Sequence, residues 1–329
     1  MSDIVARPYN KDYEITDAMF GAFRSPGGAK LFFKLLGWTT LLLTVLYFVA
    51  FPSIVRGYVD ILAGLSAFDP ANPDTVDGFD EVMSTAFLGM LPSLILLMVG
   101  SIAVIALVRA AFYRAYFHGE TTGRFPFRIG ADEGRQFLSQ LGYWSLYLLG
   151  YVIFTALIIA MSALAAVTLG SGAAAIAVGL FVALIYIGLI VYSVWFLVKF
   201  APAGALTGLR RKTHVFAARH VSRNRFWALF GALLVAFVIG YVASYIISLI
   251  GAEVAMPGLM DGSVLTDEDP ASALQALLAD SATPGFKIRA AFGILMLCAG
   301  TAFYMLMLLG PSAFFVRQWD ELDPKRAFE

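Results

Sequence analysis

Histidine and acidic residues are the first groups in this sequence to consider for metal chemistry. His214 and His220 lie six residues apart, which places them about 120° apart around a helix of about 3.6 residues per turn. A zinc pair on a helix needs a spacing of four residues, as in H-E-x-x-H. His118 has Glu120 near it but belongs to a different segment of the chain. The spacing therefore does not favour a metal site.

Residues 68–81 form an acidic segment whose composition raises the question of a calcium loop. Its acidic residues are Asp69, Asp74, Asp77, Asp80 and Glu81. An EF-hand loop needs acidic residues at alternate positions and a glutamate at its twelfth position, and the spacing here fits neither requirement. Proline, asparagine and glycine within the segment predict turns. We therefore expect a solvated acidic loop without a bound ion.

Motifs for covalent or cofactor chemistry do not emerge from the sequence. Serine, histidine and aspartate all occur, but without a G-x-S-x-G context. We find no paired carboxylates, phosphate loop or dinucleotide fingerprint either. We therefore expect a protein that is not an enzyme and that has no cofactor and no metal.

The basic segment 199–226 is the strongest candidate for a binding function, because it contains seven basic residues and no acidic residue. We expect it to form an interfacial helix at the membrane surface, with its aromatic residues at the boundary. The charges of the segment could bind anionic membrane lipids, at about 1 kcal/mol per base, or another membrane protein. The alternative is that these charges only set the topology of the chain. Nucleic acid is not expected as a partner, since one short segment lacks an extended basic face. The candidate contact residues are Arg210, Arg211, Lys212, Arg219, Arg223 and Arg225.

The composition of the chain shows what kind of fold must carry these residues. Of its 329 residues 60% are hydrophobic and 14% are charged, and the mean hydropathy is +0.78. A helix needs about 20 apolar residues to cross a bilayer. The sequence predicts an all-α polytopic membrane protein with six transmembrane helices. These helices make up a membrane domain at 31–316, which follows an N-terminal segment at 1–30 and precedes a tail at 317–329. The six apolar segments are 31–55, 86–110, 141–168, 173–198, 227–250 and 290–316.

The distribution of charge predicts the orientation of these segments. Twenty of the 23 basic residues fall on one side of the expected topology, and the positive-inside rule makes that side cytoplasmic, with both termini inside. All five tryptophans lie near the same ends, as expected for residues that prefer the headgroup level. On the opposite side, Asp269 and Pro270 predict the start of a short surface helix that continues to about Leu278.

A local repeat accompanies the start of three of the expected membrane helices. In each copy a phenylalanine precedes a glycine by five residues, at Phe32 and Gly37, at Phe137 and Gly142, and at Phe226 and Gly231. The pattern predicts three repeated helix pairs with interfacial amphipathic segments, related by an axis along the membrane normal. The same pattern is also compatible with three unrelated segments that share the chemistry of the membrane boundary.

Tyrosine side chains provide an alternative to the basic segment as a site. Tyr143, Tyr147 and Tyr151 lie four residues apart on one helix face. Together with kinks at Pro92 and Pro311, they are compatible with a hydroxyl-lined cavity in a permease or flippase-like carrier of a neutral or amphiphilic solute. The other interpretation is interhelical packing and hydrogen bonding. No ionisable residue lies near the middle of an expected span, which disfavours ion-coupled transport.

Residues 200–237 resemble a pattern of uncharacterised bacterial multi-pass proteins, including the membrane domain of glycerophosphoryl diester phosphodiesterases. The similar elements are an Ala-Pro-Ala exit from one span at residues 201–203 and an Arg-Phe-Trp start of the next at residues 225–227. The resemblance implies a module of the bacterial inner membrane that meets lipids or a partner. Phosphodiesterase activity does not carry over, because no segment matches the soluble catalytic domain. We therefore expect a non-enzymatic, multi-pass inner-membrane protein.

Overall fold

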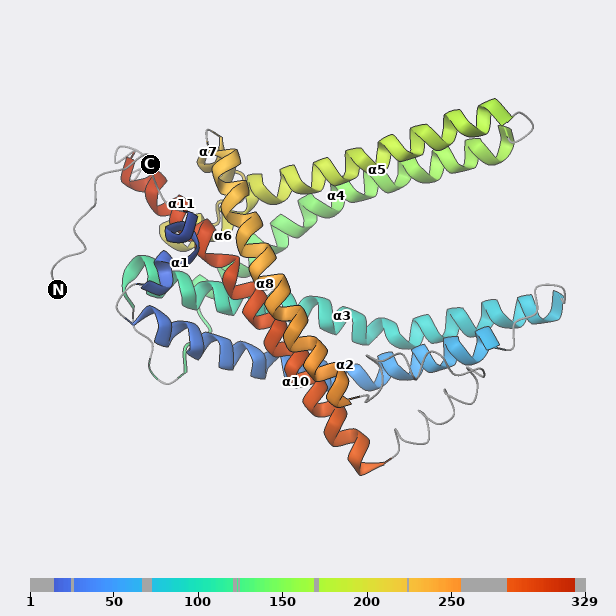
Figure 1. The fold of residues 1–329 in the computed structure, drawn as a ribbon, viewed down its shortest axis with the longest axis horizontal. Coiled ribbons are helices and arrows are strands. Elements are labelled where there is room, and N and C mark those ends of the chain that lie inside the picture. Colours follow the sequence, from blue (N-terminus) through green and yellow to red (C-terminus); the bar gives the residue numbers. More distant parts are fainter. Residues whose placement is uncertain are drawn as a thin grey trace. The chain divides into compact units, whose positions relative to one another are not determined.

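The described residues of the protein are almost entirely helical (Figure 1). The computed structural model describes residues 15–24, 27–66, 73–120, 123, 125–168, 172–223, 225–255 and 283–322, and these contain no strand. The all-α fold predicted from the sequence is confirmed. The helices are α1 (Ile15–Arg24), α2 (Gly28–Ser66), α3 (Pro73–His118), α4 (Ala131–Thr168), α5 (Gly172–Phe200), α6 (Ala203–Arg210), α7 (Ala218–Ser222), α8 (Phe226–Ala255), α10 (Pro284–Met307) and α11 (Leu309–Leu322).

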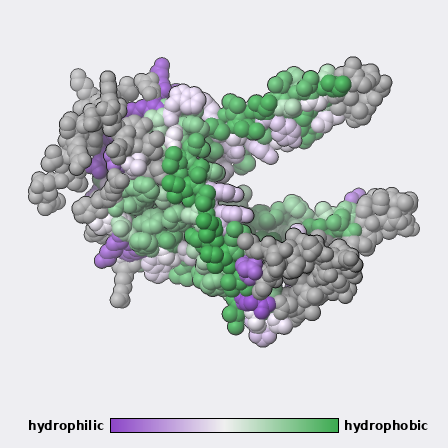
Figure 2. All heavy atoms as spheres, in the orientation of Figure 1, coloured by the Kyte–Doolittle hydropathy of each residue, from purple (hydrophilic) through white to green (hydrophobic). Residues whose placement is uncertain are grey.

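Among the described residues, six segments are long and apolar enough to cross a membrane, as the sequence predicts. They are α2, α3, α4, α5 extended into α6, α8, and α10 extended into α11. Apolar residues run along α8 and along the α4 and α5 pair on the surface (Figure 2). An apolar helix surface of this length is stable only when hydrocarbon surrounds it. The chain is therefore a multi-pass α-helical membrane protein.

The turns expected over residues 68–81 are wrong for the part that the structure describes, because α3 already begins at Pro73. Proline suits the first position of a helix, since its fixed φ is helical and its missing N–H needs no partner there. Asp69 and the short helix expected from Asp269 to Leu278 lie outside the described residues.

The two prolines expected to kink helices behave differently. α10 ends at Met307 and α11 begins at Leu309, so the helix is interrupted just before Pro311. Pro311 has no N–H to donate to the carbonyl of Met307, which explains the interruption. The interruption lies where the sequence predicts a kink, and the bend itself stays a prediction. Pro92, in contrast, lies inside α3, which continues without interruption from Pro73 to His118.

The chain divides into two compact units, each assembled from segments that are distant in the sequence. The first contains α1, the end of α3, α4 to α7, the start of α8 and α11; its described parts lie within residues 1–25, 109–236 and 309–329. The second contains α2, most of α3, the end of α8 and α10, within residues 26–108 and 237–308. The expected division at residues 30 and 316 stays a prediction.

Glycines bring the helices of the second unit into close contact. A Cβ atom on Gly300 of α10 would lie 2.8 Å from the carbonyl oxygen of Ser244 on α8. Two turns earlier on α10, a Cβ on Gly293 would lie 2.8 Å from the Cβ of Ala255. The side chain of Leu46 on α2 similarly covers Gly100 on α3. Without a hydrophobic driving force between helices in lipid, close approach of this kind supplies the packing energy.

The first unit combines a long helical pair with a core near the helix ends. α4 and α5 lie side by side (Figure 1), and the ring of Tyr192 on α5 occupies the space that a side chain at Gly150 would need. The core contains residues from α1, α5, α8 and α11, and the short helices α6 and α7 pack onto α4, α5 and α11. The basic segment is thereby attached to the longer helices of this unit. The core residues are Ala18, Val198, Leu229, Ala232 and Phe315.

The three copies of the expected repeat do not share one environment. Nothing lies within 4 Å of the position that a Cβ would take on Gly37 or Gly231, whereas a Cβ on Gly142 would lie 3.3 Å from Val215. Each copy does lie at the start of a membrane helix, in α2, α4 and α8. The repeat therefore stays a prediction.

Candidate functional site

The basic segment forms two short helices, where the sequence predicts one interfacial helix. α6 ends at Arg210, and Arg211 adopts the left-handed conformation with φ of 50° and ψ of 34°. A non-glycine residue in this conformation costs about 1–2 kcal/mol, and an ion pair between Arg211 and Glu120 offsets part of that cost. The chain turns before α7 begins at Ala218. The expectation of a single helix is therefore wrong, because the turn at Arg211 stops it.

Three of the six predicted contact residues are engaged within the protein. The guanidinium of Arg210 lies over the ring of Trp319, 5.1 Å from its centroid. Arg211 pairs with Glu120. Arg225 donates from Nη1 to Gln318 Oε1 at 3.5 Å. These three residues attach the segment to α3 and α11, so they contribute to the fold.

The other three residues, Lys212, Arg219 and Arg223, are exposed. None of them forms an ion pair with any residue that the structure describes. α7 buries Ala218, Val221 and Ser222 and turns Arg219 outward. Phe216 of the same segment is also exposed, at 63%, and so is Trp227, at 77%, which directly follows the segment in α8. We name Lys212, Phe216, Arg219, Arg223 and Trp227 the exposed basic–aromatic segment. Exposed bases with neighbouring aromatic rings are typical of surfaces that contact lipid headgroups.

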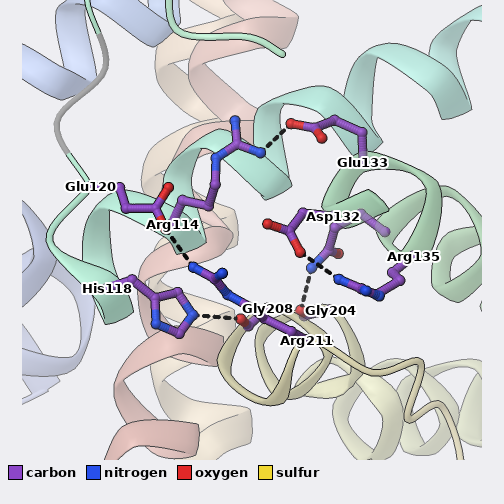
Figure 3. A network of polar contacts seen from close by, with 10 residues as sticks. Arg114, His118, Glu120, Asp132, Glu133, Arg135, Gly204, Gly208 and Arg211 are labelled. Atoms are coloured by element: carbon purple, nitrogen blue, oxygen red, sulfur yellow. Dashed lines mark hydrogen bonds and ion pairs between the residues drawn. The ribbon is translucent and has the colours of Figure 1, made fainter. Parts of the chain in front are cut away.

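The end of α3 anchors α6 in place (Figure 3). The imidazole Nε2 of His118 lies 3.0 Å from the carbonyl oxygen of Gly208. A Cβ on Gly208 would lie 2.6 Å from the Cβ of Tyr113, so only glycine allows α6 to lie this close to α3. The carboxylate of Glu120 forms an ion pair with Arg211 and a second one, at 3.6 Å, with Arg128. His118 thus has a structural partner here.

A buried polar layer lies between α3, α4 and α6 in the first unit. Arg114 Nη1 pairs with Glu133 Oε1 (Figure 3), and the two side chains are 5% and 8% exposed. Gln136 Nε2 donates to the carbonyl of Gly204 at 2.8 Å. Arg109 Nη1 donates to Gln140 Oε1. The layer connects two membrane helices to α6 through charged and amide groups.

The sequence does not readily reveal this layer. A base such as Arg109 near the end of an expected span is normally one whose long side chain extends toward water, and nothing in the sequence around Arg114 singles it out. A signal is nevertheless present, because Glu133, Gln136 and Gln140 have the i, i+3, i+7 spacing of one helix face. A polar stripe on the first turns of an apolar helix indicates a protein contact, since lipid cannot satisfy it.

The three candidate cavity tyrosines do not share one environment. Tyr143 and Tyr147 pack against Phe196 of α5, with ring centroids 5.2 Å and 5.6 Å apart. The hydroxyl of Tyr147 lies 3.2 Å from Ser193 Oγ. Tyr151 is 45% exposed. Two of the tyrosines thus take part in packing between α4 and α5, as the packing interpretation expects, and the cavity stays a prediction.

His214 gives the site a dependence on pH. Partial burial lowers the pKa of its imidazole below the ordinary value of 6.5, and the nearby charges of Arg210 and Lys212 lower it further. Near and below pH 6.5 the unfolded chain therefore binds more protons at this histidine than the folded chain does. The contribution of His214 to the free energy of unfolding is complete above that pH and is lost as the pH drops. We expect the melting temperature to fall between pH 8 and pH 5.5, and to fall less in His214→Gln. Identical pH profiles for the two proteins would contradict this prediction.

Comparisons of the chain with protein-family models, curated proteins and solved structures find no match. The resemblance of residues 200–237 to the membrane domain of glycerophosphoryl diester phosphodiesterases therefore stays a prediction.

Proposed function

We propose that this chain is a non-enzymatic module of the bacterial inner membrane that binds anionic lipid headgroups through its exposed basic–aromatic segment. The observation that supports the proposal is the exposure of Lys212, Arg219 and Arg223 without an acidic partner among the described residues. Phe216 and Trp227 add apolar surface that can enter the boundary between headgroups and acyl chains.

The orientation that the sequence predicts supports the same proposal. With both termini in the cytoplasm, the basic segment faces the leaflet with the negative surface potential. There each base contributes about 1 kcal/mol near the surface, which is roughly a fivefold change in affinity. Three exposed bases are therefore enough to enrich an anionic lipid around the protein. No observation favours the permease or flippase alternative to the same degree.

Two charge-matched triple variants test this function. The variant K212Q/R219Q/R223Q removes the exposed charges, and R210Q/R211Q/R225Q removes the same number of charges from residues that have partners within the protein. Each purified protein is reconstituted with phosphatidylglycerol and phosphatidylcholine in equal amounts, extracted mildly, and its retained lipids are quantified by mass spectrometry. We expect wild type and R210Q/R211Q/R225Q to retain excess phosphatidylglycerol, and K212Q/R219Q/R223Q to lose that excess, by roughly fivefold per base.

Equal retention of phosphatidylglycerol by both variants would contradict the proposal. If wild type instead retains a stoichiometric protein from its native membrane, and K212Q/R219Q/R223Q loses it without a change in lipid, the segment binds a protein partner. Circular dichroism and melting temperatures of both variants provide the control for folding.

A further inference from the structure

The polar layer of the first unit contains more positive than negative charge. Arg109 and Arg114 both lie on the part of α3 that belongs to a candidate membrane span. Glu133 pairs with Arg114. Arg109 contacts the neutral side chain of Gln140, and no carboxylate of the described residues forms an ion pair with it. A cation at this depth is costly unless an opposite charge accompanies it.

The hydrogen-bonding capacity of the layer is also incomplete. The Nε atom of Arg109, the Nε and Nη2 atoms of Arg114, and the Oε1 atom of Gln136 are buried and have no partner among the described residues. Arg114 is 4% exposed and Gln136 is 1% exposed, so bulk water does not supply these partners. Buried donors of a charged group without an acceptor are among the most costly unsatisfied groups in a protein.

The geometry around Gly204 brings these groups together. A Cβ on Gly204 would lie 3.0 Å from Arg109 Nη1 and 3.4 Å from Gln136 Oε1. The two side chains therefore converge above the same glycine of α6. Arg109 is only partly buried, in contrast to Arg114, so part of its side chain lies at the surface. Glycine at position 204 leaves the guanidinium room to approach the backbone of α6.

We infer that Arg109, together with Gln140, binds a phosphate group, which comes either from a phospholipid headgroup or from free phosphate. The planar guanidinium can donate two parallel hydrogen bonds to two phosphate oxygens. Phosphate is also the anion that the bilayer itself presents at the ends of membrane helices. This site uses none of Lys212, Arg219 and Arg223, so it is independent of the function proposed above.

An isosteric substitution tests the inference. Gln140→Glu places a carboxylate at the atom that already accepts from Arg109 Nη1, so an internal counter-ion competes with the external anion. Full-length protein in a neutral detergent is titrated with inorganic phosphate and, separately, with dihexanoyl phosphatidylglycerol. Native mass spectrometry counts the bound anions, and the melting temperature reports the stabilisation. We expect one saturable phosphate per wild-type chain, and binding that is at least about tenfold weaker in Gln140→Glu.

The results with the two probes distinguish the sources of the phosphate. Binding of both probes indicates a site for the phosphate group itself, and binding of the lipid alone indicates a headgroup site. Binding of neither probe to wild type, or equal binding to wild type and Gln140→Glu, would overturn the inference. Arg109→Lys provides a second variant, because it keeps the charge but loses the planar fork; wild-type affinity in this variant would also overturn it. K212Q/R219Q/R223Q is the control and should bind inorganic phosphate like wild type, while any phosphatidylglycerol that it loses belongs to the exposed basic–aromatic segment.

Discussion

Replacing Glu133 by glutamine should lower the free energy of unfolding by about 3–5 kcal/mol, the cost of removing one partner of a buried ion pair. The substitution keeps the shape of the side chain but leaves the guanidinium of Arg114 buried without its counter-charge. Because Arg109 already lacks a carboxylate partner among the described residues, the polar layer would then carry two uncompensated positive charges.

The neighbouring residue provides a matched control for this prediction. Asp132 also lies in the first turn of α4, but its ion pair with Arg135, at 2.7 Å, is partly exposed. We expect Asp132→Asn to cost under about 1 kcal/mol, as exposed pairs do. Both variants lose one negative charge from the same helix end, so the dipole contribution cancels. Thermal unfolding in detergent measures the difference, and equal melting temperatures for the two variants would show that the Arg114–Glu133 pair does not stabilise the fold.

Replacing Gly300 by leucine is expected to destabilise the second unit by about 3 kcal/mol, at the upper end of the usual cost of overpacking. The first atom of any side chain there would lie 2.8 Å from a backbone oxygen of α8, at Ser244. A backbone atom cannot move aside as a flexible side chain can. α8 and α10 would therefore have to separate along the part where Gly251 and Gly293 also face each other.

Gly89 of α3 is the matched control for Gly300. It lies in a membrane helix of the same unit, and nothing is within 4 Å of a Cβ added there. Leucine at this position gains helix propensity and meets no obstacle, so Gly89→Leu should unfold at or above the wild-type temperature. Thermal unfolding in detergent compares the two variants. A Gly300→Leu protein as stable as Gly89→Leu would mean that α8 and α10 do not pack through their backbones.

The six membrane helices could be predicted from the sequence because hydropathy over about 20 residues depends on the solvent around the helix and not on its neighbours. The ends of the helices could not be predicted in this way. α3 begins 13 residues before the expected start at residue 86, since the apolar pattern does not extend to the polar first turns at Pro73. The turn at Arg211 escapes prediction for a related reason, because its partner, Glu120, is 91 residues away in the sequence.

The candidate site shows the same limit at the level of single residues. Composition identifies six bases of the basic segment, but only the fold separates Arg210, Arg211 and Arg225, which have partners, from the three that form no ion pair with a described residue. The separation depends on α11 and on the end of α3, which are far from the segment in sequence. The Arg114–Glu133 pair escapes prediction because charge near a helix end normally indicates contact with water, and only the contacts of α3 with α4 and α6 reverse that expectation.

The lipid-facing surface of α4 determines which amino-acid substitutions this helix tolerates. No residue in the most apolar 18-residue window of this helix is fully buried within the protein, so its exposed side chains contact fluid acyl chains that have no fixed shape. Such positions are constrained by polarity and hardly by volume, and exchanges among leucine, isoleucine and valine there should be almost neutral. The inner positions at Gly150 and Tyr147 contact defined partners. Mutational tolerance along α4 should therefore alternate with the helical period.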